Sequence, residues 1–380
     1  WSRDVEANAT TIEESGGDTP VFINGDVTVD GFIIRTFPEG GEMGSAYEAI
    51  AVSSSSSGQV VISNVEVYTA GSNFPHAAIR VYSGSSSVWV QDSLLVSGGG
   101  GTPDTAVAIR HGSSGTLLVE GSELVTLEAE GGDSFGIQAQ NGNLVVRDST
   151  IRSGDSFGGA SFTGVRTSGS VQSAEIVRSR LAITVAAGGG QTRGIDHTAG
   201  SLTIVNSILE LESAGNAAAL RAASEAIILN NTIIATSNSP NPDDLLGGLI
   251  LSTPAADIRN NIVSADATGE ASVQAIGGSE TPPARHNTFF NGGGPVSESY
   301  DGVDGNVTLE VFGQFAFFDP SGDDGDVTND FALSSDSPVH VREEGLDLSG
   351  EGLLNDFNGN PRTGDGSLGY SRGALELDQQ

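Results

Sequence analysis

A six-residue pattern recurs along this chain at nearly constant spacing. It reads Val-x-Asp-Ser-x-Ile in its plainest copy, Val146–Ile151, and it returns at 90–95, 204–209 and 228–233. With the Asp or Asn taken as the anchor of each copy, the anchor column is Gly31, Asn64, Asp92, Gly121, Asp148, Arg178, Asn206, Asn230, Asn260 and His286. The spacing averages about 28 residues, and a fixed period of roughly 20 to 50 residues indicates stacked repeats.

Aliphatic side chains occupy two positions in each of the first nine copies. Two residues before the anchor stand Val29, Ile62, Val90, Val119, Val146, Ile176, Ile204, Ile228 and Ile258. Three residues after it stand Ile34, Val67, Leu95, Leu124, Ile151, Leu181, Leu209, Ile233 and Val263. The residues between them are variable and mostly polar, and this alternation is typical of a strand with one buried face. We therefore expect both columns to stack inside a solenoid.

A second short strand is predicted in each repeat, about half a period from the first. Its copies are Ala49–Val52, Ala78–Val81, Ala108–His111, Gly136–Ala139, Gly164–Thr167, Gly194–His197, Ala219–Ala222 and Gly248–Leu251. Two strands per repeat favour a parallel β-helix over a propeller, whose blades need four strands in about 40–50 residues. Asn, Asp and Gly tolerate a left-handed backbone, so the anchors are interpreted as a structural Asn/Asp ladder at a corner.

The repeat divides the chain into three parts. Residues 1–19 are polar and acidic and are expected to form an N-terminal arm, 20–291 the parallel β-helix, and 292–380 a C-terminal capping segment. Seven of the fifteen Phe residues lie between Phe289 and Phe331. An apolar cluster of this kind is expected to cover the last rung, whose edge and core a solenoid otherwise leaves open.

Charge and composition exclude several classes of partner. The formal net charge is −33, all basic residues are Arg, and there is no Lys and no Cys. So negative a surface repels nucleic acid and anionic lipid, and a disulfide or thiolate metal site cannot form. No run of 18 apolar residues occurs, so no transmembrane segment is expected. The chain begins at Trp1 rather than Met, which favours a processed, exported protein.

The repeat and the tail together resemble secreted bacterial proteins of the right-handed parallel β-helix repeat type, whose ending precedes a surface anchor. The matching stretches are Asp319-Pro320, Leu333–Pro338, Asp356–Arg362 and Ser371–Glu376, the last with Ser-Arg in place of Asp-Ile. This resemblance implies an all-β, right-handed parallel β-helix of about ten rungs, in a secreted or cell-surface protein. It leaves activity open, because the family includes lyases, hydrolases, epimerases and adhesins.

One outward column of the second strand carries candidate ligand-binding residues. They are Arg80, Arg110, Gln138, Arg166, Asp196 and Arg221. Rungs about 4.8 Å apart align these side chains on one face, where Arg forks could grip the carboxylates or sulfates of a glycan. Asp196, between Arg166 and Arg221, is then a candidate general base, and these three residues are the catalytic candidates. The alternative is a wall of charges that satisfy one another.

The motifs of β-helix enzymes are mostly missing. There is no Lys base and no Gly-His-Gly, whereas a pectate-lyase-like pairing of calcium carboxylates with an Arg base stays open. No cofactor is required, and calcium is the one candidate metal. Its expected ligands are the carboxylates of Asp319, Asp323, Asp326 and Asp330, since calcium prefers oxygen. The spacing does not match an EF-hand. Trp89 is expected to point outward, one of only two Trp residues.

These features favour an extracellular or cell-surface structural or adhesive protein. Its expected partners are a polysaccharide, another cell-surface component, or further copies of itself. The alternative is a polysaccharide lyase or hydrolase that acts on an anionic glycan along the face between Arg80 and Arg221.

Overall fold

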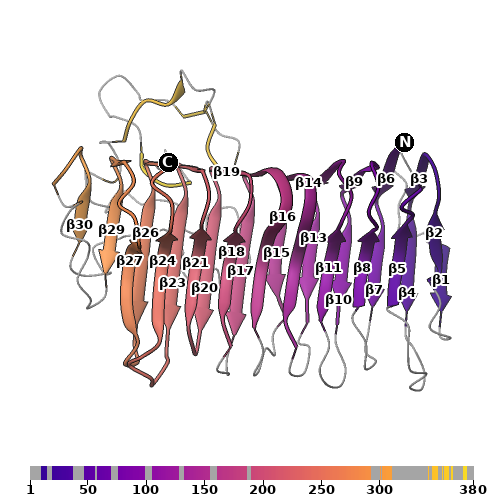
Figure 1. Ribbon diagram of the computed structural model, residues 1–380, viewed down its shortest axis with the longest axis horizontal. Coiled ribbons are helices and arrows are strands. Elements are labelled where there is room, and N and C mark those ends of the chain that lie inside the picture. The colour runs from indigo at the N-terminus through magenta and orange to yellow at the C-terminus, as the bar shows by residue number, and fades with distance from the viewer. Residues whose placement is uncertain are drawn as a thin grey trace.

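The computed structural model is an elongated parallel β-solenoid (Figure 1). It describes residues 10–14, 19–36, 47–55, 58–69, 76–98, 105–127, 132–154, 161–185, 190–291, 300, 302–309, 341, 345–349, 353, 355–358, 361–362 and 371–374. Each turn of the solenoid contributes one strand to each of three ladders, called here the first, second and third ladder. The predicted parallel β-helix fold is confirmed.

The first and second ladders belong to one sheet of 18 strands. The first contains β2 (Val21–Ile23), β5 (Tyr47–Val52), β8 (His76–Val81), β11 (Ala106–His111), β18 (Thr192–His197), β21 (Ala217–Ala222), β24 (Leu245–Leu251) and β27 (Ser272–Gly278). The second contains β3 (Val27–Asp30), β6 (Gln59–Ser63), β9 (Ser87–Gln91), β12 (Thr116–Glu120), β19 (Ser201–Val205), β22 (Ala226–Leu229), β25 (Ala256–Arg259) and β28 (Ala284–Arg285). Two long strands, β14 (Ser134–Arg147) and β16 (Phe162–Val177), run through both ladders and join them.

The third ladder is a sheet of 12 strands. Its members are β1 (Thr10–Glu14), β4 (Phe32–Thr36), β7 (Glu66–Thr69), β10 (Leu94–Ser97), β13 (Glu123–Thr126), β15 (Thr150–Ser153), β17 (Arg180–Val185), β20 (Ile208–Ser213), β23 (Thr232–Ser237), β26 (Ile262–Ala267), β29 (Thr288–Asn291) and β30 (Val307–Leu309). Part of the expected N-terminal arm is therefore the strand β1, which pairs in parallel with β4. The solenoid has about eight turns, slightly fewer than the ten rungs expected, and strands are short at its two ends, with three residues in β2 and two in β28.

The core is built from the two predicted aliphatic columns. Every residue of both columns is buried, from Val29 at 8% exposure to Ile62, Val146 and Ile233 at 0%. The column before the anchor lies on the second ladder and the column after it on the third, so they meet inside the solenoid. Burying one aliphatic side chain stabilises the folded state by about 1.5–3 kcal/mol, and each repeat adds such side chains to the core.

The anchor residues turn the chain between the second and third ladders. All ten of the predicted anchors have a positive φ, from 45° at Arg178 to 72° at Gly31. A left-handed residue cannot continue a strand, so the single core strand expected in each repeat is divided into two that lie in different sheets. This is why each turn has three strands and not the two that were expected.

The polar ladder at this corner lies one residue after the anchor, which corrects the expected position. Its members are Ser93, Ser122, Ser149, Ser179, Ser207, Asn231, Asn261, Asn287 and Asn306. From Ser122 onward, the side-chain oxygen of each accepts the backbone N–H of the member one turn before, at 2.9–3.3 Å, and Ser93 accepts the N–H of Val65 at 3.2 Å. The Asn members also donate Nδ2 to a carbonyl of the preceding turn, as Asn261 does to Ile228 at 2.8 Å. The ladder thus satisfies backbone groups that the sheets leave unpaired.

The described parts of the tail lie along the side of the last turns, over the same corner (Figure 1). On the second-ladder side, Leu348 packs with Val205 and Leu229. On the third-ladder side, Val341 and Ala374 pack with a row of apolar residues: Ile208, Ile234, Ile262, Phe290 and Leu309. Phe289 enters the solenoid core beside Tyr300, with ring centroids 6.0 Å apart. In the tail, Phe357 is partly buried against the row that includes Phe290, and Phe312, Phe315, Phe317, Phe318 and Phe331 lie outside the described residues.

Candidate functional site

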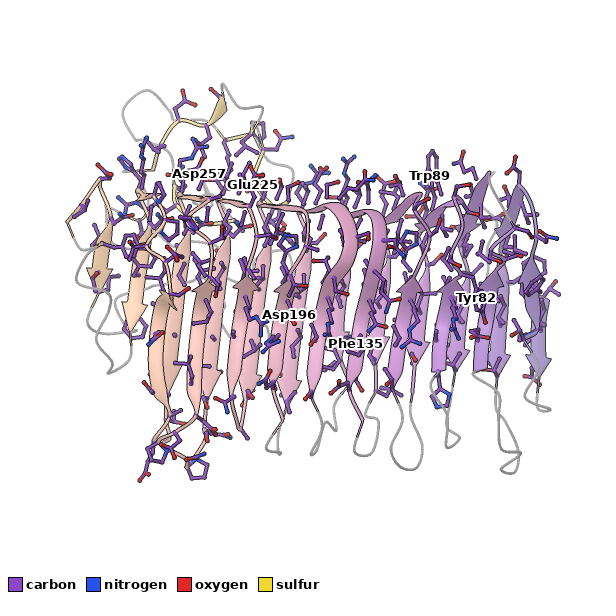
Figure 2. All side chains as sticks on the ribbon, viewed as in Figure 1. Tyr82, Trp89, Phe135, Asp196, Glu225 and Asp257 are labelled. Atoms are coloured by element: carbon purple, nitrogen blue, oxygen red, sulfur yellow. The ribbon has the colours of Figure 1, made fainter. Side chains whose placement is uncertain are left out.

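The predicted Arg column exists as a continuous row on the first ladder. Parallel pairing places Arg80 beside Arg110, then Gln138, Arg166, Asp196 and Arg221 on successive strands. We call this row the Arg face. A second outward row runs beside it and contains Glu48, Phe135 and Arg193. Figure 2 shows Tyr82, Phe135 and Asp196 on this side of the solenoid.

One end of the Arg face is neutralised within the protein. Glu48 is 4% exposed, and its Oε1 accepts hydrogen bonds from Arg80 Nη1 at 2.7 Å and from the Tyr82 hydroxyl at 3.2 Å. The Arg80 guanidinium lies 4.4 Å from the centre of the Tyr82 ring. Burial and the Glu48 carboxylate raise the pKa of Tyr82. Arg80 is therefore held in place and its charge is balanced.

The other end contains a buried carboxylate between two guanidinium groups. Asp196 is 3% exposed, its Oδ2 accepts from Arg193 Nη1 at 2.8 Å, and its Oδ1 lies 3.2 Å from Arg221 Nε. The second contact is an ion pair whose angle does not make a hydrogen bond. Of the three catalytic candidates, Asp196 and Arg221 are therefore in direct contact, as an ion pair. Arg193, on the neighbouring row, was not predicted. A regular strand points residues three apart to opposite faces, so the spacing of Arg193 and Asp196 was no signal of this ion pair.

The middle of the Arg face has cations without a carboxylate partner among the described residues. Arg110 donates Nε to Gln138 Oε1 at 2.8 Å. The guanidinium of Arg166 lies 5.6 Å from the centre of the Phe135 ring, and its buried Nε has no hydrogen-bond partner. Burial, with a smaller contribution from the positive charge of Arg80, lowers the pKa of Arg110. Two guanidinium groups two rungs apart, about 10 Å, can hold an anion repeated along a chain.

The two histidines next to this row, His111 and His197, are core residues. His111 and His197 are fully buried in the inward column that includes Ala139 and Thr167. His197 bonds to Thr167 Oγ1 through Nδ1 at 2.6 Å and contacts the Gly200 carbonyl through Nε2 at 3.1 Å. Burial lowers the pKa of both rings, that of His111 to about 4. Neither ring reaches the Arg face.

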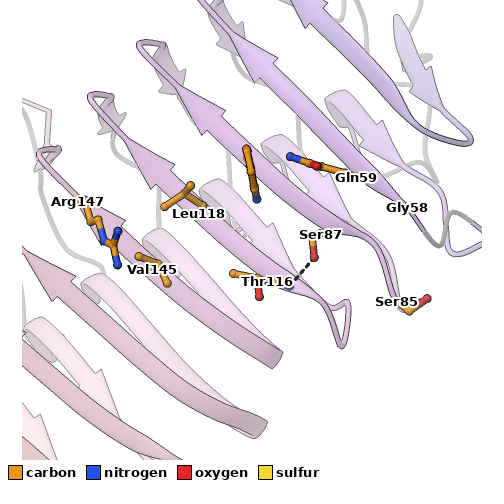
Figure 3. Close-up of a pocket in the computed structure, with 9 residues that line it drawn as sticks. Gly58, Gln59, Ser85, Ser87, Thr116, Leu118, Val145 and Arg147 are labelled. Carbon is orange, nitrogen blue, oxygen red and sulfur yellow. Dashed lines mark hydrogen bonds between the residues drawn. The ribbon is translucent and has the colours of Figure 1, made fainter.

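A second candidate site lies on the outer face of the second ladder. A hollow of about 520 Å³ is lined by Gly58, Gln59, Ser85, Ser87, Trp89, Thr116, Leu118, Val145 and Arg147 (Figure 3). We call it the Trp89 hollow. Trp89 is 37% exposed, points outward as predicted, and lies on a different side of the solenoid from Asp196 (Figure 2). Its neighbours are far apart in sequence, and only the pairing of β6, β9, β12 and β14 brings them together.

The predicted calcium ligands Asp319, Asp323, Asp326 and Asp330 lie outside the described residues. Within the described part of the chain, no group of three or more His, Asp or Glu side chains is arranged to hold a metal ion. The same residues contain no helix long and apolar enough to cross a membrane.

These features define the class of the protein as a parallel β-solenoid with two candidate ligand faces. No family model matches the chain, and no curated protein or solved structure matches it either. The resemblance to secreted bacterial β-helix repeat proteins therefore stays a prediction.

Proposed function

We propose that this chain is an extracellular or cell-surface structural or adhesive protein that binds an anionic glycan on the Arg face without cleaving it. The observation that carries the proposal is the contrast within one row. Arg110 and Arg166 have no carboxylate partner among the described residues, whereas Asp196 is buried between Arg193 and Arg221. The guanidinium groups of Arg110 and Arg166 can therefore pair with an anionic ligand, whereas the carboxylate of Asp196 is not accessible to a ligand.

Binding without catalysis follows from the surroundings of Asp196. A general base must come within hydrogen-bond reach of the proton that it removes. The carboxylate of Asp196 is almost fully buried and both of its oxygens face Arg side chains. A substrate would first have to displace Arg221, whose side chain is 36% exposed.

Binding to a sulfated glucan and to a uronic acid oligosaccharide tests this function. The wild-type protein should bind one of them, with affinity that falls as salt rises, because the contacts are between exposed charges. The double variant Arg110→Ala, Arg166→Ala should bind at least about tenfold more weakly, which corresponds to about 1.4 kcal/mol. Arg152→Ala is the control, since Arg152 lies on the third ladder, away from the Arg face, and the side chain of its partner Glu123 is 44% exposed to solvent. Equal loss in the control would contradict the proposal.

The alternative is a lyase in which an Arg of the same row acts as the base. The lowered pKa of Arg110 favours it, because a guanidinium must lose its proton to accept one. New reducing ends, or the ultraviolet absorbance of an unsaturated product, would establish this activity. Neither is expected from the wild-type protein with either glycan.

Further copies of the chain are a second candidate partner. The strand β1 stands at the end of the 12-stranded sheet, and an edge strand is a template for pairing. Light scattering at increasing concentration should then show oligomers, and they should disappear when residues 1–19 are deleted. A monomer at every concentration would exclude this partner.

A further inference from the structure

The Trp89 hollow combines two kinds of lining in adjacent rows. An apolar row on successive strands contains Val61, Trp89, Leu118 and Val145. Beside it runs a row of amide and hydroxyl side chains, Gln59, Ser87 and Thr116. Residues two apart on a strand are separated by about 6.6 Å, so a small ring lying on the apolar row reaches the polar row with its edge.

The polar row has groups available to a ligand. Ser87 Oγ accepts the backbone N–H of Thr116 at 3.2 Å, as Figure 3 shows. The Thr116 hydroxyl and the Gln59 side-chain amide have no partner within the described structure, so both can donate to and accept from a bound molecule. Gly58 adds no side chain to this edge of the hollow.

The one cation among the residues that line the hollow is already paired. Arg147 Nη2 donates to Glu175 Oε1 at 3.0 Å. In the same row as Arg147, Glu120 Oε2 accepts a hydrogen bond from the neutral Gln91 Nε2 at 3.0 Å and keeps its negative charge. A ligand therefore meets no free cation here, and the net charge of −33 repels anions. The Trp89 hollow favours a neutral ligand, in contrast to the Arg face.

The same side of the solenoid is covered further along by the chain itself. Val205 and Leu229, on the second ladder, are each only 5% exposed, because the tail residue Leu348 packs against them. Trp89 keeps 37% of its surface exposed. Aromatic rings with a polar border are common at binding sites.

We propose that the Trp89 hollow binds a neutral oligosaccharide. Trp89 stacks on the C–H face of one pyranose ring, Leu118 and Val145 contact the next ring, and Gln59 and Thr116 hydrogen-bond to ring hydroxyls. A pyranose has this pairing of an apolar face with hydroxyls around its edge. The inference extends the proposed glycan-binding function to a second site with a different ligand class.

The test uses the full chain with Trp1→Phe, so that Trp89 is its only tryptophan. Cellohexaose, xylohexaose and mannohexaose are titrated while indole fluorescence and heat are measured. At least one of them should shift the fluorescence saturably. In the same background Trp89→Ala should weaken its binding at least about tenfold and Thr116→Val about threefold. Trp89→Tyr, which keeps an aromatic ring, should restore most of the affinity lost in Trp89→Ala.

Phe22→Ala is the control, because Phe22 is a 64% exposed ring at the end of the solenoid. It should leave neutral-sugar binding unchanged, and so should the double variant of Arg110 and Arg166. If the wild-type protein bound a neutral sugar but no anionic glycan, the proposed function would fail and this inference would stand. Absence of binding to all three neutral sugars would overturn it, and so would equal binding by Trp89→Ala or tighter binding of a proline-rich peptide.

Discussion

Asn260 and Leu346 lie 86 residues apart and form a reciprocal pair of hydrogen bonds. Asn260 Nδ2 donates to the Leu346 carbonyl at 2.8 Å, and the Leu346 N–H donates to Asn260 Oδ1 at 2.7 Å. Asn206 makes a similar pair, with Nδ2 donating to the Asn355 carbonyl and Oδ1 accepting from Arg362. The side chains of these late anchors thus hold the tail on the solenoid. They are amides because a carboxylate could only accept, and its buried charge would be costly.

Asn260→Asp should therefore loosen the tail. The substitution keeps the size of the side chain but removes the donor to the partly buried Leu346 carbonyl, and it places a carboxylate at the buried position of Asn260. We expect a loss of about 2 kcal/mol in the free energy of unfolding. Urea unfolding measures it, and limited proteolysis should cut the tail first.

Asp92→Asn is the matched control for this prediction. Asp92 is an anchor with the same left-handed backbone, but it is exposed to solvent. Exchanging its carboxylate for an amide should change stability by less than about 0.5 kcal/mol. Equal effects at Asp92 and Asn260 would show that burial beneath the tail is not what matters.

The polar ladder offers a second prediction. Asn261→Ala removes the acceptor for the Asn231 N–H and the donor to the Ile228 carbonyl, both of which are buried. We expect a loss of about 2–4 kcal/mol. Asn261→Ser should lose clearly less, since Ser149 and Ser179 fill the same position in earlier turns and accept the same backbone bond. A stability of Asn261→Ser equal to that of the Ala variant would contradict this account of the ladder.

Stability should depend on pH through His111. Burial lowers its pKa from 6.5 to about 4 in the folded protein, so below pH 6.5 the unfolded chain binds a proton that the folded chain does not. Above pH 6.5 the ring is neutral in both states and the fold carries no penalty for it. As pH falls from 6.5 toward 4, the free energy of unfolding decreases by about 3 kcal/mol, because the unfolded chain takes up the proton.

His111→Leu removes this titration. The difference in unfolding free energy between the variant and the wild type should shift in favour of the variant as pH falls through that window. Comparing the two proteins cancels the carboxylates that they share. A difference that stays constant with pH would rule out the effect, and NMR titration of the ring should give a pKa below 5 or so.

Asp196→Asn tests whether the one carboxylate of the Arg face acts as a base. If the face only binds, removing the negative charge between Arg193 and Arg221 should strengthen binding of a sulfated glucan about threefold. If the face is catalytic with Asp196 as its base, the same change should abolish product formation. Circular dichroism of both proteins checks that the solenoid is intact.

Much of the fold was predictable because the repeat supplies the same information many times. The inward columns, such as Ile62 and Ile233, and the left-handed anchors, such as Asn64 and Gly121, each follow from one repeated constraint. The row from Arg80 to Arg221 was also predictable, since parallel pairing carries a sequence column directly into a spatial one. The corner ladder was predicted one residue too early, because both the anchor and the next position favour small polar residues.

The contacts across rows were not predictable. Column spacing cannot say that Arg193 pairs with Asp196 from the adjacent row, or that Glu48 neutralises Arg80. It also could not foresee that the tail lies along the corner, because Asn206 and Asn260 look like every other anchor until Asn355 and Leu346 reach them.

By itself, the sequence determined the period, the buried columns and the turn at each anchor, since these depend on short-range preferences repeated at every rung. Only the tertiary structure decided which charged side chains have an oppositely charged partner. Arg166 has none among the described residues, and Asp196 is paired with Arg193 and Arg221. The tertiary structure also decided that Trp89 stays exposed while Leu229 is covered. The physical reason is that burial and pairing depend on neighbours brought together by the whole coil, and the repeat does not encode them.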